Sequence, residues 1–132
     1  MFRRRNIIGF LVVAAIVAVG LFMFNSHRKL ERDIADLNSQ IGVGEHWDGS
    51  EHPVIFYRRN VAKRFPIGTA KSDVLQQMQA TASNPNVVHR SVSEDSDLYS
   101  VSFAQMLIWP TQIDFYFTFD SNHNLNHIVV DN

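Results

Sequence analysis

The stretch from Ile7 to Phe24 is eighteen residues long and contains no charged side chain. Three arginines at positions 3–5 precede it, and Arg28 and Lys29 follow it shortly afterwards. In a lipid bilayer such a run must be helical, because a helix satisfies its own backbone N–H and C=O groups. At ~1.5 Å per residue it spans roughly 27 Å, close to the ~30 Å hydrocarbon core. We therefore predict a transmembrane helix over residues 7–24.

A secretory signal peptide also combines a basic start with an apolar run. The small residues Ala18 and Gly20 could form a cleavage site, but the apolar run continues to Phe24, which favours an uncleaved anchor. The chain has no cysteine, so a lipid-modified N-terminal cysteine is excluded. The arginine cluster favours a cytoplasmic N-terminus, residues 1–6, with the remaining residues on the other side of the membrane.

The soluble part is mildly acidic. The chain has twelve Lys and Arg residues; without the arginines at positions 3–5 nine remain, against thirteen Asp and Glu, which gives a net charge near −4. Such a domain is a poor nucleic-acid binder, so we expect no nucleic-acid partner. The residues from 53 to 132 suffice for one small domain and not for two.

Residues 25–52 are predicted to form a juxtamembrane helix and a linker. Lys29–Ile41 carries one apolar stripe at helical spacing, and the turn-rich stretch Gly42–His52 follows it. The stripe has two interpretations, a stalk that forms a homodimer or a helix face covered by the protein's own domain. Its members are Leu30, Ile34, Leu37 and Ile41.

The domain proper is predicted to start at Pro53, which suits the first turn of a helix. An amphipathic helix should run to about Phe65, and its four basic side chains are candidates for binding anionic headgroups or an acidic partner surface. The alternative is an ordinary solvated face. The four candidates are Arg58, Arg59, Lys63 and Arg64.

A second helix and a set of strands should follow. Thr69 is predicted to cap the second helix, which ends before Ser83. The apolar period then changes from 3.6 to 2, and the clearest strand, Ile113–Phe119, has one face that is nearly all phenylalanine. The last strand carries Leu125, Ile128 and Val130, a spacing that indicates a bulge. The predicted fold is α+β, with two helices packed on an antiparallel meander of three or four strands.

Several of these positions resemble a known family. The chain resembles the SmpA/OmlA (BamE-like) family and, more broadly, the β-lactamase-inhibitor-like fold over roughly residues 54–130. The resemblance implies a non-catalytic binding or scaffolding domain. Members that assist outer-membrane assembly carry a lipoprotein cysteine, whereas an apolar helix stands in its place here. The matching positions are Ile67, Gly68, Thr69, Asp73, Val74, Leu75, Tyr116, Phe117, Phe119, Asp120, Leu125 and Ile128.

The sequence contains no pattern typical of an active site. It has no cysteine nucleophile, no phosphate-binding glycine loop and no Gly-x-Ser-x-Gly motif. His123 and His127 could bind a metal with Asp120 or Asp131, but the pair straddles a turn, so we predict no metal site. We expect no enzymatic activity and no cofactor.

The apolar segment Met106, Leu107, Ile108 and Trp109 is the remaining candidate for partner binding, because Trp and Met are enriched at recognition surfaces. Its alternative is a place in the core. Taken together, the sequence predicts a single-pass protein of the bacterial inner membrane whose periplasmic domain, residues 53–132, binds another envelope protein. The alternative function is an inhibitor or immunity protein that blocks a toxin or hydrolase.

Overall fold

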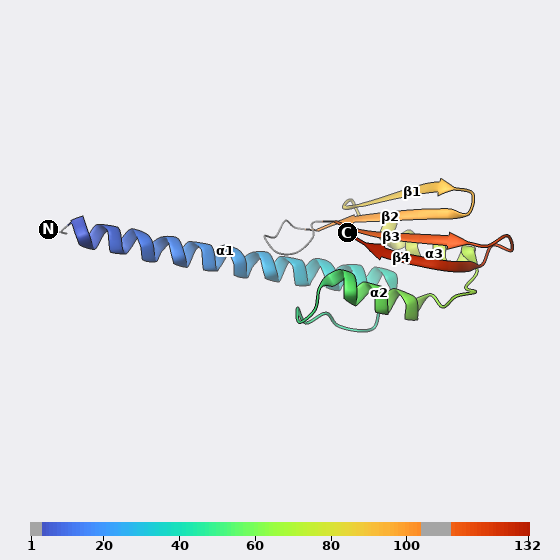
Figure 1. Cartoon of the computed structure of the whole chain (residues 1–132), viewed down its shortest axis with the longest axis horizontal. Coiled ribbons are helices and arrows are strands. Elements are labelled where there is room, and N and C mark those ends of the chain that lie inside the picture. The colour runs from blue at the N-terminus through green and yellow to red at the C-terminus, as the bar shows by residue number, and fades with distance from the viewer. Residues whose placement is uncertain (1–3, 104–111) are drawn as a thin grey trace.

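The computed structural model describes residues 4–103 and 112–132, and shows one long helix leading into a small domain (Figure 1). The helices are α1 (Arg4–Ile41), α2 (Pro53–Arg64) and α3 (Lys71–Ala82), and the strands are β1 (Val87–Ser93), β2 (Ser96–Ser102), β3 (Gln112–Phe119) and β4 (Leu125–Asp131). The predicted α+β class, with helices before strands, is confirmed.

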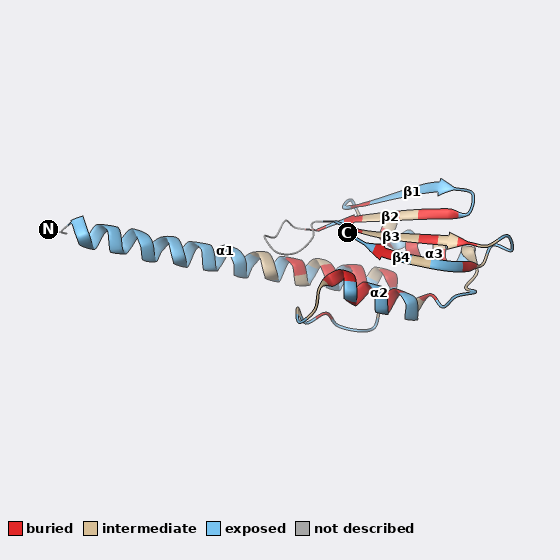
Figure 2. Ribbon diagram, in the orientation of Figure 1, coloured by how far each residue is buried: buried red, intermediate tan, exposed pale blue. Residues whose placement is uncertain are grey.

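α1 joins the apolar run and the juxtamembrane segment in one unbroken helix of 38 residues. Its apolar part is exposed along its whole length, and burial begins only where the helix enters the domain (Figure 2). The helix ends at Gly42, whose φ of +86° favours glycine. The N–H groups of Gly42 and Val43 both donate to Asn38 O, at 2.9 and 2.8 Å, and so close the last turn.

The four strands form an antiparallel sheet in the order β1-β2-β3-β4. Alternation in β3 places Ile113, Phe115, Phe117 and Phe119 on one buried face, as predicted. The predicted bulge in β4 is also confirmed. Thr118 pairs with His127 but Phe119 pairs with Leu125, so Asn126 is the extra residue that returns Leu125 to the buried face.

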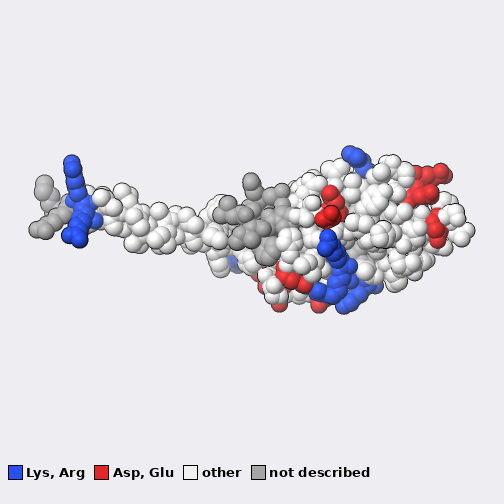
Figure 3. All heavy atoms as spheres, in the orientation of Figure 1, with Lys and Arg blue, Asp and Glu red and all other residues white. Residues whose placement is uncertain are grey.

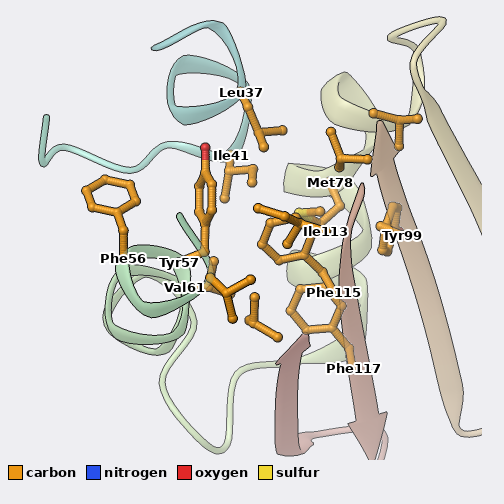
Figure 4. Packing of buried hydrophobic residues seen from close by; sticks show 14 of the residues in the cluster. Leu37, Ile41, Phe56, Tyr57, Val61, Met78, Tyr99, Ile113, Phe115 and Phe117 are labelled. Atoms are coloured by element: carbon orange, nitrogen blue, oxygen red, sulfur yellow. The ribbon is translucent and has the colours of Figure 1, made fainter. Parts of the chain in front are cut away.

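The two predicted helices, α2 and α3, cover the phenylalanine face of the sheet together with the second half of α1. Figure 4 shows Leu37 and Ile41 of α1 and Met78 of α3 beside the phenylalanine rings. α2 contributes Tyr57, whose ring lies 5.3 Å from that of Phe115 in an edge-on contact. The second half of α1 is therefore part of the core of the domain.

This packing bears on two features of residues 25–52, the role of the apolar stripe and the start of the folded unit. Leu30, Ile34, Leu37 and Ile41 are each 1% exposed or less, because the domain of the same chain covers them. They are not available to a second copy, so this stripe does not form a dimer seam here. The folded unit also starts well before Pro53: Trp47 of the predicted linker is buried, and its ring lies 6.0 Å from that of His27.

The two shorter helices begin differently from each other. His52 is the N-cap of α2, where its Nδ1 accepts a hydrogen bond from Val54 N–H at 3.2 Å. The prediction that Thr69 caps α3 is wrong. Its hydroxyl donates to Pro66 O at 2.6 Å, and its carbonyl accepts from Leu125 N–H at 2.7 Å. Residue 69 therefore belongs to an extended segment beside β4, and α3 begins after Ala70 without a side-chain cap.

Candidate interaction surface

The predicted partner-binding segment Met106, Leu107, Ile108 and Trp109 lies outside the described residues. Its role stays a prediction. The described residues on either side are Phe103, which is buried after β2, and Gln112, which begins β3.

The basic side chains of α2 gather on one side of the domain with acidic side chains beside them, and further acidic side chains lie at the end of the sheet that is far from the apolar helix (Figure 3). Arg58 reaches the neighbouring sheet edge. Its Nε donates to Val130 O at 2.8 Å, and its Nη2 lies 3.8 Å from a carboxylate oxygen of Asp131. This arginine therefore covers an outward-facing carbonyl of β4.

Arg59 joins α2 to the segment that follows α1. Its guanidinium contacts Glu51 at 2.6 and 3.0 Å and Glu45 at 3.3 Å. A hydrogen bond from the Asn60 amide, and then the charge of Arg59, hold the pKa of Glu45 below its usual value. The hydrogen bond from Arg59 likewise lowers the pKa of Glu51. The local role of Arg59 is to tie residues 45–51 to α2.

Arg64 and Lys63 differ although they are adjacent. Arg64 donates from Nε to Ile41 O at 3.2 Å and from Nη2 to the Gln77 side chain, so it links the ends of α1 and α2 to the middle of α3. Lys63 is exposed and has no hydrogen bond or ion pair within residues 4–103 and 112–132. Arg58, Arg59 and Arg64 thus make contacts within the domain. Of the four predicted basic residues, Lys63 alone is a solvated cation in the described part of the chain.

The helices leave the other face of the sheet uncovered in the described part of the chain. The register places Arg90, Leu98, Tyr116 and Val129 in one row across all four strands. Val129 is 40% exposed, and Leu98 and Tyr116 are partly exposed. We call this surface, together with Val88 on β1, the outer face. No helix of the described part of the chain covers it.

A polar cluster lies between β1 and β2 on the opposite, helix-covered face. His89 Nε2 lies 2.9 Å from Asp97 Oδ1, and the His89 ring stacks on Tyr99 with 4.2 Å between ring centroids. Burial and then the Asp97 charge raise the pKa of the Tyr99 hydroxyl well above its usual value. Asp97 is almost fully buried, so the cluster joins β1 to β2 through side chains as well as through the backbone.

The other histidines do not converge on one point. His52 caps α2, and His123, with φ of +60°, occupies the turn between β3 and β4. Among the described residues, no three His, Asp or Glu side chains are placed to hold a metal ion.

A hollow of about 360 Å³ lies between the end of α1 and α2. Glu45 and Lys63 both line it, so it favours neither an anionic nor a cationic ligand.

Comparisons with known proteins give no relative: no family model, no curated protein and no solved structure matches this chain. The resemblance to the SmpA/OmlA family stays an expectation. The candidate surface is therefore interpreted from its own residues and contacts.

Proposed function

We propose that this chain is a single-pass protein of a bacterial inner membrane, with its first residues in the cytoplasm and a periplasmic domain that binds another envelope protein. The observation that carries the proposal is the continuity of α1, whose apolar part is 0% buried and whose other end is core. A cleaved signal peptide would have no need to share one rigid helix with the folded domain.

The same helix sets the distance between domain and membrane. Leu30, the first buried residue of the core, lies six positions after Phe24, the last apolar residue of the run. At ~1.5 Å per residue this is roughly 9 Å, so the domain lies directly on the membrane surface. A domain held there by a stiff helix presents its outer face to neighbouring membrane or periplasmic proteins in one orientation.

Cysteine accessibility in intact cells tests the location. The chain has no cysteine, so single cysteines at the exposed positions Ser50 and Ser121 can be labelled with a membrane-impermeant thiol reagent. We expect both to react in a membrane-bound, full-length protein. Labelling only after lysis would invert the topology, and labelling of a shortened soluble form would mean that residues 7–24 are a signal peptide.

Photocrosslinking in the same cells tests the partner. A photoreactive residue at Val129, on the outer face, should crosslink to one defined envelope protein. The matched control is Ala62, which is exposed on α2 away from the sheet. Equal crosslinking at both positions would contradict a role for the outer face.

A further inference from the structure

The two edges of the sheet are not equivalent. The β4 edge is occupied by other parts of the chain: Arg58 donates to Val130 O, Gly68 N–H donates to Leu125 O, and Ala70 forms a bridge with Asn124. The β1 edge has no such cover within the described residues. Figure 2 shows β1 exposed along almost its whole length, and only Val87 of this strand is buried.

The register shows which backbone groups of β1 are free. Ser102 N–H donates to Asn86 O, so this pair is hydrogen-bonded. In an antiparallel ladder such pairs alternate, which directs the N–H and C=O groups of His89 and Ser91 away from β2. An edge of this kind is a template for another extended segment.

The side chains of β1 define what that segment should contain. Val88 and Val92 are 61% and 48% exposed, with Arg90 between them in the strand. Val88 and Arg90 lie on the outer face, and Val92 lies at the register shift between Ser91 and Ser93. Arg90 has no ion pair or hydrogen bond in the described part of the chain. The strand thus presents an apolar, a cationic and an apolar side chain at every second position.

We propose that β1 binds an extended segment of a partner protein as a fifth strand, with a carboxylate opposite Arg90 and apolar side chains beside Val88 and Val92. This inference rests on the proposed function and specifies the partner chemistry. Backbone hydrogen bonds to His89 and Ser91 supply affinity, and the Arg90–carboxylate pair supplies specificity and register.

A second copy of the chain fits this edge poorly. The strands run roughly along the direction of α1 (Figure 1), and antiparallel pairing of two β1 strands would point the two α1 helices in opposite directions. Two anchors so arranged cannot enter the same membrane. In addition, Val87–Ser93 contains Arg90 and His89 but no acidic residue, so a second β1 offers no carboxylate to Arg90.

Three synthetic peptides test the inference on the full chain in detergent micelles. The first is the seven-residue peptide Thr-Val-Thr-Glu-Thr-Val-Thr, in which two valines and a central glutamate occupy every second position. The second is the same peptide N-methylated on the backbone edge that would face β1, and the third has lysine in place of glutamate. Binding is followed by the amide chemical shifts of β1 and by titration.

We expect the glutamate peptide to shift the His89 and Ser91 amides, and N-methylation to weaken its binding about tenfold or more. The Arg90→Glu variant should reverse the preference, binding the lysine peptide better than the glutamate peptide. Lys63→Glu makes the same charge change on α2, far from β1, and should leave the preference unchanged.

Three results would overturn the inference: no shift at β1 with millimolar peptide, equal binding of the N-methylated peptide, or no effect of Arg90→Glu. A dimer in light scattering that Arg90→Glu dissociates would also overturn it, because a second copy would then occupy the edge. The thiol-labelling experiment decides the location of the domain separately. An outward-facing domain that ignores these peptides would leave the proposed function standing without this partner chemistry.

Discussion

At the scale of single residues, basic side chains that look alike in the sequence have different tasks. Arg58 covers a β4 carbonyl, Arg59 pairs with two glutamates, and Arg64 links α1, α2 and α3. Arg90 on β1 has no such contact among the described residues. Charge in the sequence therefore does not separate structural arginines from those free to bind a partner.

The hydrogen bond from Arg58 to Val130 O gives a prediction for stability. Arg58→Ala should lower the free energy of unfolding by about 1 kcal/mol, because it removes the donor that covers an outward carbonyl of β4. Arg90→Ala, the matched control on the other edge, should change it by less than about 0.5 kcal/mol. Urea denaturation of the full chain in mild detergent measures both, and equal effects would contradict the role given to Arg58.

The ion pairs of Arg59 give a prediction for pH dependence. The folded-state pKa values of Glu45 and Glu51 are lowered, so their contribution is present above about pH 4.5 and is lost as the pH falls below it. The thermal midpoint should fall less on acidification in Arg59→Met than in the parent chain. Arg90→Met should retain the parent profile, and parallel curves for all three proteins would refute this assignment.

At the scale of elements, α1 combines an exposed apolar part with a part that packs into the domain. Its first part presents apolar side chains on all sides, as a lipid-facing helix does, whereas its second part buries only one stripe. The two parts share a helix axis because no proline or chain reversal separates them. Any tilt of the apolar part is therefore transmitted to the domain.

The α1 stripe gives a prediction that distinguishes a core from a dimer seam. Ile34→Ala should lower the free energy of unfolding by about 2–5 kcal/mol, because it leaves a cavity among buried residues. Its effect should not depend on protein concentration. Asp36→Ala, on an exposed position of the same helix, is the control. Loss of a dimer in Ile34→Ala, without loss of monomer stability, would restore the self-association interpretation.

At the scale of the whole molecule, the domain cannot be separated from the second half of α1. Leu37 and Ile41 cover part of the phenylalanine face, and Trp47 packs near His27. A fragment that starts at Pro53 would expose that face to water. The folded unit extends from about His27 to the end of the chain.

Two truncations test this boundary. Residues 26–132 should give a soluble, cooperatively unfolding domain, because the fragment retains the complete stripe from Leu30 to Ile41. Residues 53–132 should aggregate or remain without fixed tertiary structure, since the apolar cover that α1 supplies is missing. Near-ultraviolet circular dichroism and size-exclusion chromatography distinguish the outcomes, and a well-folded 53–132 fragment would contradict the boundary.

Much of this architecture follows from local patterns in the sequence. The eighteen uncharged residues from Ile7 to Phe24 determine the apolar helix, because no other backbone conformation satisfies its hydrogen bonds in lipid. The alternation in β3 determines its buried face, and the three-residue step from Leu125 to Ile128 determines the bulge in β4. Each of these depends on a period or spacing within one short segment.

Tertiary structure decided what periodicity alone left open. The stripe from Leu30 to Ile41 could face the chain's own domain or a second copy, and only packing against α3 and the sheet selected the first. Thr69 has a hydroxyl that could cap a helix, but its carbonyl instead accepts a hydrogen bond from Leu125 N–H at the start of β4. The open β1 edge and the closed β4 edge depend on contacts such as that of Arg58 with Val130, which are 72 residues apart in sequence. The physical reason is that local patterns specify which groups must be buried or bonded, whereas the folded arrangement determines which partner meets them.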